Sequence, residues 1–422
     1  MNEFQGPVIG KPRGRLGRRT PSTDAIFGLV AGGLAVAGLL ALGQTVKLIQ
    51  PEDAVAVGIN AAYDANNNVL VYHHVKRFFH YNPDGTLYLK LVGQGTTLTA
   101  MCDTGGAVQQ LLLDEATNGE IKGVGVVLNP AAAPAAFTTG LHSDVLTAVA
   151  KAQALATTLL ESAVFVDCIL LEGVLGAAAT PTTLPNLRLL ASENVSVCIA
   201  ADPAVLAVNG GAGYAEIGAA LGMLSIRKVS ECLGSVDVTR KPEASKGTDT
   251  YPLTDLAGGY FLSSALSNGR RFATLSGADK SALGASGYIY AGRFEGFDGT
   301  YFNDSHSCTE VSGDYAYIED NRVWNKAAKL VRQALIPVMR GDVEIDPATG
   351  FLPASTITYY QTKAGKTVKD MATAGELSGE PVVTIEPNQD VVGAGEISLE
   401  VGYVRRGVLR RIRATVGAIN PA

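Results

Sequence analysis

The sequence has few charged residues and lacks the short motifs that mark common catalytic sites. Asp, Glu, Lys and Arg make up 18% of the 422 residues, whereas apolar residues make up 47%. A chain of this length and composition buries a large core, inside itself or against other chains. The formal net charge of −6 gives no reason to expect nucleic-acid binding. There is no Walker A loop, no Gly-x-Ser-x-Gly elbow and no His-Glu-x-x-His motif, so no enzyme class is indicated.

Cysteine is also scarce, and no Cys-x-x-Cys pair occurs. The cysteines are odd in number, widely spaced and mostly set in apolar runs such as VFVDCILLEG and NVSVCIAAD. This usage is typical of reduced core thiols in a protein made in a cytoplasm, and it argues against a disulfide framework. The five are Cys102, Cys168, Cys198, Cys232 and Cys308.

Metal ligands with suitable spacing are missing as well. Adjacent histidines point to different sides of a helix, and no histidine pair here has the i, i+4 spacing of a shared metal site. The segment NDSHSC brings oxygen, nitrogen and sulfur together but has no obvious fourth ligand. We therefore expect no metal and no cofactor. The residues considered are His73, His74, His80, Asp304, His306 and Cys308.

The segment NGGAGYAEIG invites a nucleotide-binding interpretation but departs from the pattern. Glu216 stands where the third glycine of Gly-x-Gly-x-x-Gly should be. A phosphate-facing Lys or Ser/Thr is missing, and no acid follows at the required spacing. The glycines predict a tight turn into a helix instead.

From about residue 25 the chain alternates apolar strands with helices. Strands are predicted in TLYLKLVG, IKGVGVVLN, VFVDCILLEG and VSVCIAAD. Helices are predicted in NVLVYHHVKRFFHY, in YAEIGAALGMLSIRKV and in residues 142–162, the last with Ser143 or Asp144 as its cap. This alternation indicates an α/β layer with a largely parallel sheet.

The uncharged stretch AIFGLVAGGLAVAGLLALG, residues 25–43, raises the question of a membrane span. Its five glycines favour buried strands instead, with a turn at Gly32–Gly33. The residues that follow resume an ordinary strand, and Pro51 then opens a helix. Two alternatives to a structural protein stay open here: a membrane-anchored surface or secretion protein that uses 25–43 as its anchor, and an enzyme that binds a nucleotide through NGGAGYAEIG.

Both ends of the chain are basic, and the middle is acidic. Residues 1–24 contain five basic and two acidic residues, and residues 401–422 contain five arginines and no acid. Given a net charge of −6, the residues between them carry −14. The ends could therefore be attracted to the body of another copy of the chain.

Residues 287–339 carry the remaining strong patterns. GYIYAGRFEGFDGTYFND predicts a hairpin-like aromatic pair, and DYAYIEDNRVWNKAAKLVRQALIPVM predicts a long amphipathic helix stopped by Pro337. The end of the chain, GEISLEVGYV and VLRRIRATVGAIN, alternates in the manner of strands.

The region 287–353 resembles the C-terminal core of contractile tail sheath proteins, found in myophage tails and in phage-derived contractile injection systems. The matching segments are GYIYAGR, GTYFND, DYAYI, RVWNK, and Arg332 leading to Leu335-x-Pro337. Upstream, PEDAVAVGINAAYDANNNVLVYHHVKRFF is similar to the N-terminal part of a Mu-like or bacteroidal branch of that family, and VSECLGSV is similar to the end of its middle region. Residues 100–220 depart from the family, which varies widely there.

The resemblance implies an α/β (α+β overall) fold, a sheath-type core with mixed sheets flanked by helices. Extended N- and C-terminal arms would form intersubunit strands. It also implies four segments: an N-terminal arm (1–24), an α/β outer domain (25–240), a core domain facing the tube (241–402) and a C-terminal strand arm (403–422). The apolar stretch 25–43 would then lead into the folded core, without membrane insertion.

The implied function is that of a non-enzymatic structural subunit. Such subunits stack in rings as a helical homopolymer around an inner tail-tube protein, and contraction drives the tube through a target envelope. The implied partners are other copies of the chain, the tube protein, and baseplate and terminator proteins, with no direct contact to nucleic acid. The implied location is a virion tail or phage-like particle assembled in the cytoplasm of a bacterial host.

The basic ends supply the candidate interface residues, because arm arginines could set the register between neighbouring subunits. The resemblance further implies that the tube contact comes from the C-terminal domain, where we single out two lysines of the helix over 320–336. The candidate interface residues are Arg13, Arg15, Arg18, Arg19, Arg405, Arg406, Arg410, Arg411 and Arg413, and the candidate tube-facing residues are Lys326 and Lys329.

Overall fold

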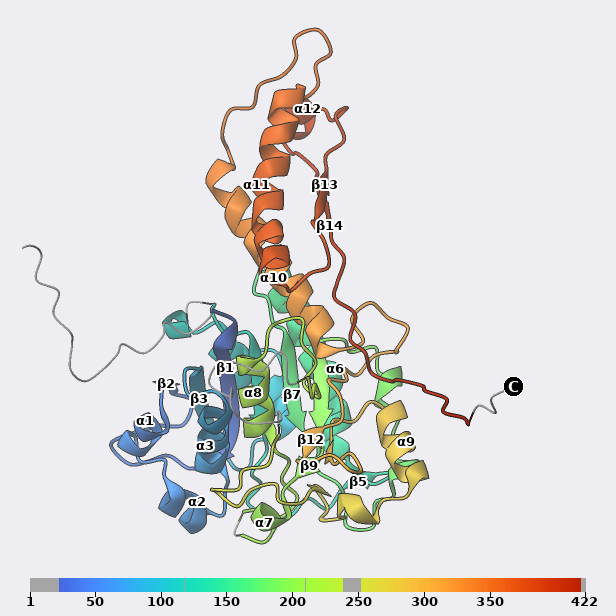
Figure 1. Ribbon diagram of the computed structural model, residues 1–422. Helices are drawn as coiled ribbons and strands as arrows, with labels where there is room; N and C mark the ends of the chain where they lie inside the picture. The colour runs from blue at the N-terminus through green and yellow to red at the C-terminus, as the bar shows by residue number, and fades with distance from the viewer. Residues whose placement is uncertain (1–22, 118, 209, 238–251, 419–422) are drawn as a thin grey trace, which may run out of the picture.

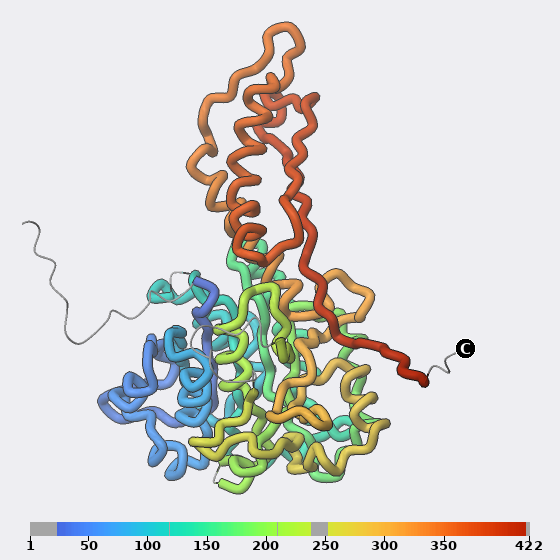
Figure 2. The backbone as a smooth tube through the Cα atoms, viewed as in Figure 1, coloured from blue at the N-terminus to red at the C-terminus, as the bar shows by residue number. Residues whose placement is uncertain are grey.

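The computed structural model describes residues 23–117, 119–208, 210–237 and 252–418. Figures 1 and 2 show three parts: a body (residues 23–317), a protrusion that rises from it (318–402), and a C-terminal arm that runs down from the protrusion across the body (403–418). The predicted N-terminal arm, residues 1–24, lies almost entirely outside the described residues.

The body is built on a six-stranded sheet with the order β2-β3-β1-β4-β7-β8. All neighbouring strands are parallel except β2 and β3, which are antiparallel. The predicted α/β class with a largely parallel sheet is therefore confirmed. The strands are β1 (Ile26–Gly33), β2 (Thr45–Leu48), β3 (Thr86–Gly93), β4 (Gly123–Val127), β7 (Cys168–Glu172) and β8 (Val195–Cys198).

The apolar stretch 25–43 supplies the central strand. β1 pairs with β3 on one side and with β4 on the other, and all of its residues are buried. The predicted turn at Gly32–Gly33 is wrong, because both glycines continue β1. Gly32 is required there, since a Cβ atom would lie 2.1 Å from the carbonyl oxygen of Leu128.

Residues 34–43 leave the sheet and form an exposed loop that includes Leu39 and Leu42. The stretch is thus half core strand and half surface loop, which does not support the membrane-anchor alternative. Across the described ranges, no helix has both the length and the apolarity that crossing a membrane requires.

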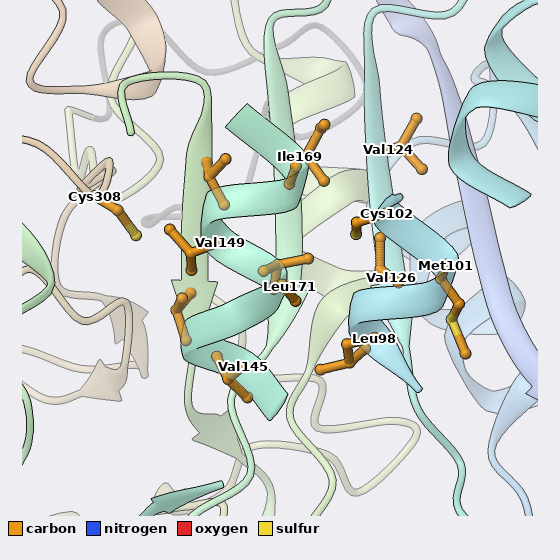
Figure 3. Packing of buried hydrophobic residues seen from close by; sticks show 14 of the residues in the cluster. Leu98, Met101, Cys102, Val124, Val126, Val145, Val149, Ile169, Leu171 and Cys308 are labelled. Carbon is orange, nitrogen blue, oxygen red and sulfur yellow. The ribbon is translucent and has the colours of Figure 1, made fainter. Parts of the chain in front are cut away.

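Helices cover both faces of the sheet because the strand residues alternate between the two faces. In β7, Ile169 and Leu171 point to one face, whereas Cys168 and Leu170 point to the other. Figure 3 shows Val145 and Val149 packed over Ile169 and Leu171 on the first face. The helices over this face are α4 (Leu98–Cys102), α5 (Ala107–Leu112) and α6 (Ser143–Glu161), and the opposite face carries α1 (Pro51–Ala56), α2 (Ala61–Asn67), α3 (Val71–Tyr81) and α8 (Ile217–Ile226).

The start of α6 differs from the prediction. The helix begins at Ser143 after His142, and neither predicted residue caps it with its side chain. The carboxylate of Asp144 instead accepts hydrogen bonds from the backbone N–H of Leu98, at 2.6 Å, and from the hydroxyl of Thr99. Asp144 stands at the right position in the sequence to cap α6, but its carboxylate accepts hydrogen bonds from the first residues of α4 instead.

Residues 252–317 pack into the same body. β10 (Ala265–Leu266) pairs with β9 (Ala200–Ala201), and Ile289 exchanges backbone hydrogen bonds with Val197 and Ile199 beside β8. The predicted aromatic pair is confirmed as β11 (Ala291–Gly292) against β12 (Tyr301–Phe302). The remaining short elements of the body are α7 (Pro203–Leu206), α9 (Gly277–Ala285), β5 (Phe137–Thr138) and β6 (Leu141–His142).

The protrusion consists of two long helices and a short antiparallel hairpin. The predicted helix before Pro337 is confirmed as α10 (Ile318–Leu335). Its apolar stripe packs against α11 (Ala354–Thr373), which the sequence analysis did not predict. The hairpin consists of β13 (Val382–Thr384) and β14 (Glu400–Gly402), with α12 (Val391–Ala394) between them. The predicted domains 25–240 and 241–402 refer to positions in an assembly and stay predictions.

Two glycines allow α3 and α8 to cross closely. A Cβ atom on Gly218 would lie 2.3 Å from the carbonyl oxygen of His74, and one on Gly222 would lie 2.6 Å from that of Phe78. The two contacts lie one helical turn apart on both helices, so the backbones meet along a shared seam.

We expect Gly222→Ala to lower the free energy of unfolding by about 1–3 kcal/mol, because the added methyl group overpacks this seam. Gly284→Ala in α9 is the matched control. A Cβ atom there meets no heavy atom within 4 Å, so we expect a gain of about 0.5–1 kcal/mol from helix propensity and chain entropy. Urea unfolding measures both variants, and equal effects of the two would contradict the close crossing.

Candidate functional site

The C-terminal arm begins beside the turn that follows α11. Arg405 forms a backbone bridge with Leu377, and the N–H of Ser378 donates to the carbonyl oxygen of Val404 at 2.8 Å. Farther along, residues 407–418 form no backbone–backbone hydrogen bond with any described residue. In the described part of VLRRIRATVGAIN, residues 408–418, the predicted strand is therefore chain that pairs with no strand of the described residues.

Apolar side chains of the arm point into solvent. The exposed fractions are 76% for Leu409, 77% for Ile412 and 95% for Val416. Unpaired backbone groups combined with exposed branched side chains are the features of an open strand edge. The arm can therefore accept or supply strand pairing outside this chain.

One arginine of the arm reaches into the body. Nε of Arg410 lies 2.9 Å from Oδ2 of Asp304 and 3.2 Å from Oδ1, and its Nη2 donates to Oε1 of Glu319. The guanidinium also lies over the ring of Tyr317, 3.4 Å from its centroid. We call Asp304, Tyr317 and Glu319 the Arg410 socket.

Burial and charge act differently on the two carboxylates of the socket. For Asp304, burial opposes ionisation, but the charges of His306 and Arg410 and its hydrogen bonds together lower its pKa. For Glu319, burial is dominant and raises the pKa to about 7 although Arg410 acts in the opposite direction. The socket is therefore an anionic site that needs a cation beside it.

The other predicted C-terminal arginines differ in their surroundings. Nη1 of Arg405 lies 2.6 Å from Oδ1 of Asp320, and Nε of Arg406 donates to the carbonyl oxygen of Leu377 at 3.4 Å. Arg411 and Arg413 are exposed and form no ion pair within the described part of the chain. The other predicted interface residues, Arg13, Arg15, Arg18 and Arg19, lie outside the described residues.

The predicted tube-facing lysines lie at the base of the protrusion. Nζ of Lys326 lies 2.6 Å from a carboxylate oxygen of Asp24 and 2.6 Å from one of Glu376, and its side chain is 21% exposed. Nζ of Lys329 donates to the carbonyl oxygen of Gly119 at 3.1 Å. Lys326 thus links the start of β1 to the end of α11, and a tube contact for either lysine stays a prediction.

Two groups of side chains bring together atoms that metals prefer. In the first, Nε2 of His73 lies 3.0 Å from Oε2 of Glu216, while Nδ1 of His74 accepts the N–H of Gly218 at 3.1 Å. The adjacent histidines thus lie on the same side of α3 near Glu216, which corrects the expectation from their spacing. Glu216 also caps α8, so the predicted turn into a helix at NGGAGYAEIG is confirmed.

The second group is Cys232, Asp304 and Glu319. Sγ of Cys232 donates to Asp304 at 3.1 Å, and Arg410 supplies the positive charge beside these groups. The sequence neighbours considered with Asp304 do not join it: His306 hydrogen bonds to Arg188, and Cys308 lies in the core (Figure 3). All five cysteines are free and buried, as the sequence analysis predicts.

Comparison with known families and structures gives two results. The model of the DUF2586 N-terminal domain matches residues 6–306, and that of the DUF2586 C-terminal domain matches residues 314–422. The boundary between them falls just before α10, where the protrusion begins. No functionally curated protein matches the sequence.

Solved structures of the same fold include contractile sheaths. The helical sheath of the anti-feeding prophage (AFP) in its contracted state has a TM-score of 0.59 and 15% identity, with 99% of each chain covered. The AFP baseplate, 6-fold symmetrised, has a TM-score of 0.59 and 13% identity, again with 99% of each chain. The PVC sheath complex of an extracellular contractile injection system, in its contracted state, has a TM-score of 0.51 and 12% identity, with 99% and 98% covered. The predicted sheath-type fold is therefore confirmed.

The contacts at the base of the protrusion generate a prediction. We expect Lys326→Met to lower the free energy of unfolding by about 1–3 kcal/mol, because it removes the ion pairs that Lys326 forms with Asp24 and Glu376 at the base of the protrusion. Lys329→Met is the matched control on the same helix, and we expect a loss below about 1 kcal/mol because it removes one hydrogen bond to a backbone carbonyl. Urea unfolding at pH 7 measures both, and equal losses would contradict the role given to Lys326.

Proposed function

The chain belongs to the DUF2586 family, and from this membership and its fold we propose that it is the structural subunit of a contractile sheath. Copies of the chain polymerise as a helix around an inner tube and contract to drive the tube through a target envelope. The observation that carries the proposal is that the sheath fold extends over 99% of the chain. That includes the protrusion and the arm, which a compact enzyme domain would not need.

The features of the arm support the proposal that subunits polymerise by strand exchange. Its unpaired backbone groups and exposed Leu409, Ile412 and Val416 need a partner surface. The hairpin of β13 and β14 offers one, because it has only two strands and Val382 at its edge is 67% exposed. An isolated two-stranded hairpin is marginally stable, so added strands from neighbours would stabilise it.

The distribution of charge along the chain also supports contact between an arm and a neighbouring subunit. The residues between the two basic ends carry −14, so an arm is attracted to the body of a neighbouring copy. Arg411 and Arg413 are suited to set this register because no described residue of their own chain pairs with them. The predicted N-terminal arginines would act in the same way.

The resemblance to sheath proteins supports a position in the assembly. We place the predicted outer domain, 25–240, on the outside of the sheath and the predicted core domain, 241–402, which contains the protrusion, toward the tube. The further partners are the tube protein and the baseplate and terminator proteins at the two ends. The sheath would belong to a phage tail or a phage-like particle assembled in a bacterial cytoplasm, with no catalytic role for the subunit.

Electron microscopy of the purified chain tests the proposal. We expect hollow cylinders from the full chain, and only monomers or loose rings from a variant lacking 1–24 and 403–422, because the arms link the subunits. Circular dichroism and thermal unfolding of the truncated variant check that the body remains folded. Monodisperse particles from both proteins would refute the sheath function, whereas cylinders from both would refute the linking role of the arms.

A second prediction concerns the register between neighbouring subunits. We expect the double variant Arg411→Gln/Arg413→Gln to raise the critical concentration for assembly about tenfold at low salt, because two exposed intersubunit ion pairs are lost. The difference from the unmodified chain should shrink in high salt, since screening removes the same attraction. Sedimentation of polymer at a series of salt concentrations measures both effects, and a difference that persists in high salt would contradict an electrostatic register.

A further inference from the structure

The Arg410 socket is occupied by the arm of the same chain, and strand exchange does not require this contact. We propose that the socket anchors each arm to its own body through Arg410 and so fixes the point at which the arm leaves, with only residues 411–422 free to reach a neighbouring subunit. The anchoring concerns the isolated subunit, whereas its consequence for the neighbour rests on the proposed sheath function.

The geometry of the socket suits a guanidinium group. Nε and Nη2 of Arg410 donate to two different carboxylates, Asp304 and Glu319, while its plane lies over the ring of Tyr317. Only arginine combines donors in a fixed fork with a flat face that can stack. Lysine would keep the charge but lose the second hydrogen bond and the stacking.

The two carboxylates of the socket are also held by contacts that do not involve the arm. The hydroxyl of Ser305 donates to Glu319, and the thiol of Cys232 and the N–H of Ser305 donate to Asp304. These bonds hold both carboxylates in place at the point where α10 begins. Two carboxylates that are 9% and 4% exposed and close together repel each other unless a cation lies between them.

Among the described residues, Arg188 also lies beside the socket, with its guanidinium over the same Tyr317 ring at 5.2 Å from the centroid. Its Nη1 atom, however, already donates to the backbone carbonyl oxygens of Ser307, Thr309 and Ala316, and its Nη2 atom hydrogen bonds to His306. Within the described part of the chain, Arg410 is therefore the residue that forms ion pairs with both carboxylates of the socket.

Arg410 is the last described residue of the arm that forms a hydrogen bond or ion pair with its own chain. Upstream, Arg405 pairs with Asp320 and Arg406 with the backbone of Leu377. Downstream, every described residue from 411 to 418 is exposed. The free segment 411–422 spans at most about 40 Å when extended, which limits how far away the acceptor sheet of a neighbour can lie.

The thiol of Cys232 is a natural reporter of docking. Cys232 is 5% exposed and lines, together with Gly407–Ile412 of the arm, a groove of about 620 Å³. When the arm leaves the socket, this thiol should become accessible. Cys102 provides an internal reference, because it is fully buried in the sheet core far from the arm.

The test is maleimide labelling of the full-length chain at a concentration below its assembly threshold, with mass spectrometry of each cysteine. We expect Arg410→Met to raise the labelling rate of Cys232 about tenfold or more relative to Cys102, because charge-assisted hydrogen bonds to buried carboxylates are lost. Arg410→Lys should give an intermediate rate. Arg413→Met, a control three residues farther along the arm and outside this groove, should leave the rate unchanged.

Other outcomes overturn the proposal. An unchanged rate in Arg410→Met, with thermal unfolding unchanged, would mean that the socket does not hold the arm. Protection of Cys232 in the unmodified chain that is lost on dilution would mean that a second copy fills the socket. Since labelling is measured on unassembled chains, its failure leaves the sheath function standing, and failure to form cylinders leaves the anchor standing.

Discussion

The C-terminal part of the molecule depends on the buried polar contacts that hold α10 in the body, which we call the seat of α10. Arg322 is fully buried, with Nε 3.6 Å from a carboxylate oxygen of Asp167, and the amide of Asn325 donates to the same carboxylate at 3.0 Å. Nη atoms of Arg322 also reach the backbone carbonyl oxygens of Arg227 and Lys228. Burial raises the pKa of Asp167 to about 6, so ionisation of this carboxylate depends on keeping its partners. A helix held by such contacts has one orientation, because shifting it would leave charges buried and unpaired.

Helix α10 holds both the rest of the protrusion and the C-terminal arm. Its buried half carries the seat, and its outer half supports α11 and the β13–β14 hairpin through an apolar stripe. Its first turn carries Glu319 and Asp320, which bind Arg410 and Arg405 of the arm. Acidic residues are favoured at a helix N-terminus by the backbone dipole, so the same turn both begins the helix and attracts the basic arm.

The sequence predicts well whatever depends on local periodicity. The parallel sheet and α8 follow from continuous apolar runs, because they are buried on all sides. α3, α6 and α10 follow from apolar spacing, because each buries one stripe. α11 escapes prediction because only Ala364, Val368 and Met371 of its twenty residues are buried, among polar and glycine residues. Its stability comes from the stripe of α10, which is a tertiary effect that local pattern does not contain.

The polar sites could not be predicted for a related reason. Lys326 looks like a surface residue on an amphipathic helix, yet Asp24 lies 302 residues away in sequence and closes over it. Likewise Cys232 meets Asp304 across 72 residues and His73 meets Glu216 across 143. Pairs this distant leave no spacing signal, and the charge difference between the basic ends and the acidic middle indicated partners for the ends without identifying their residues.

The contrast between a rigid seat and an open arm bears on how a sheath subunit could move without detaching. The seat fixes α10 in the body, and the arm is fixed in turn to the first turn of α10 as far as Arg410. Beyond that point the described arm has neither backbone pairing nor buried side chains. A rearrangement of subunits that kept them linked would therefore be taken up by the residues after Arg410, because rotation there breaks no hydrogen bond or ion pair among the described residues of the subunit. Motion at the seat would instead separate the buried ion pair and leave charges buried without partners, which costs several kcal/mol.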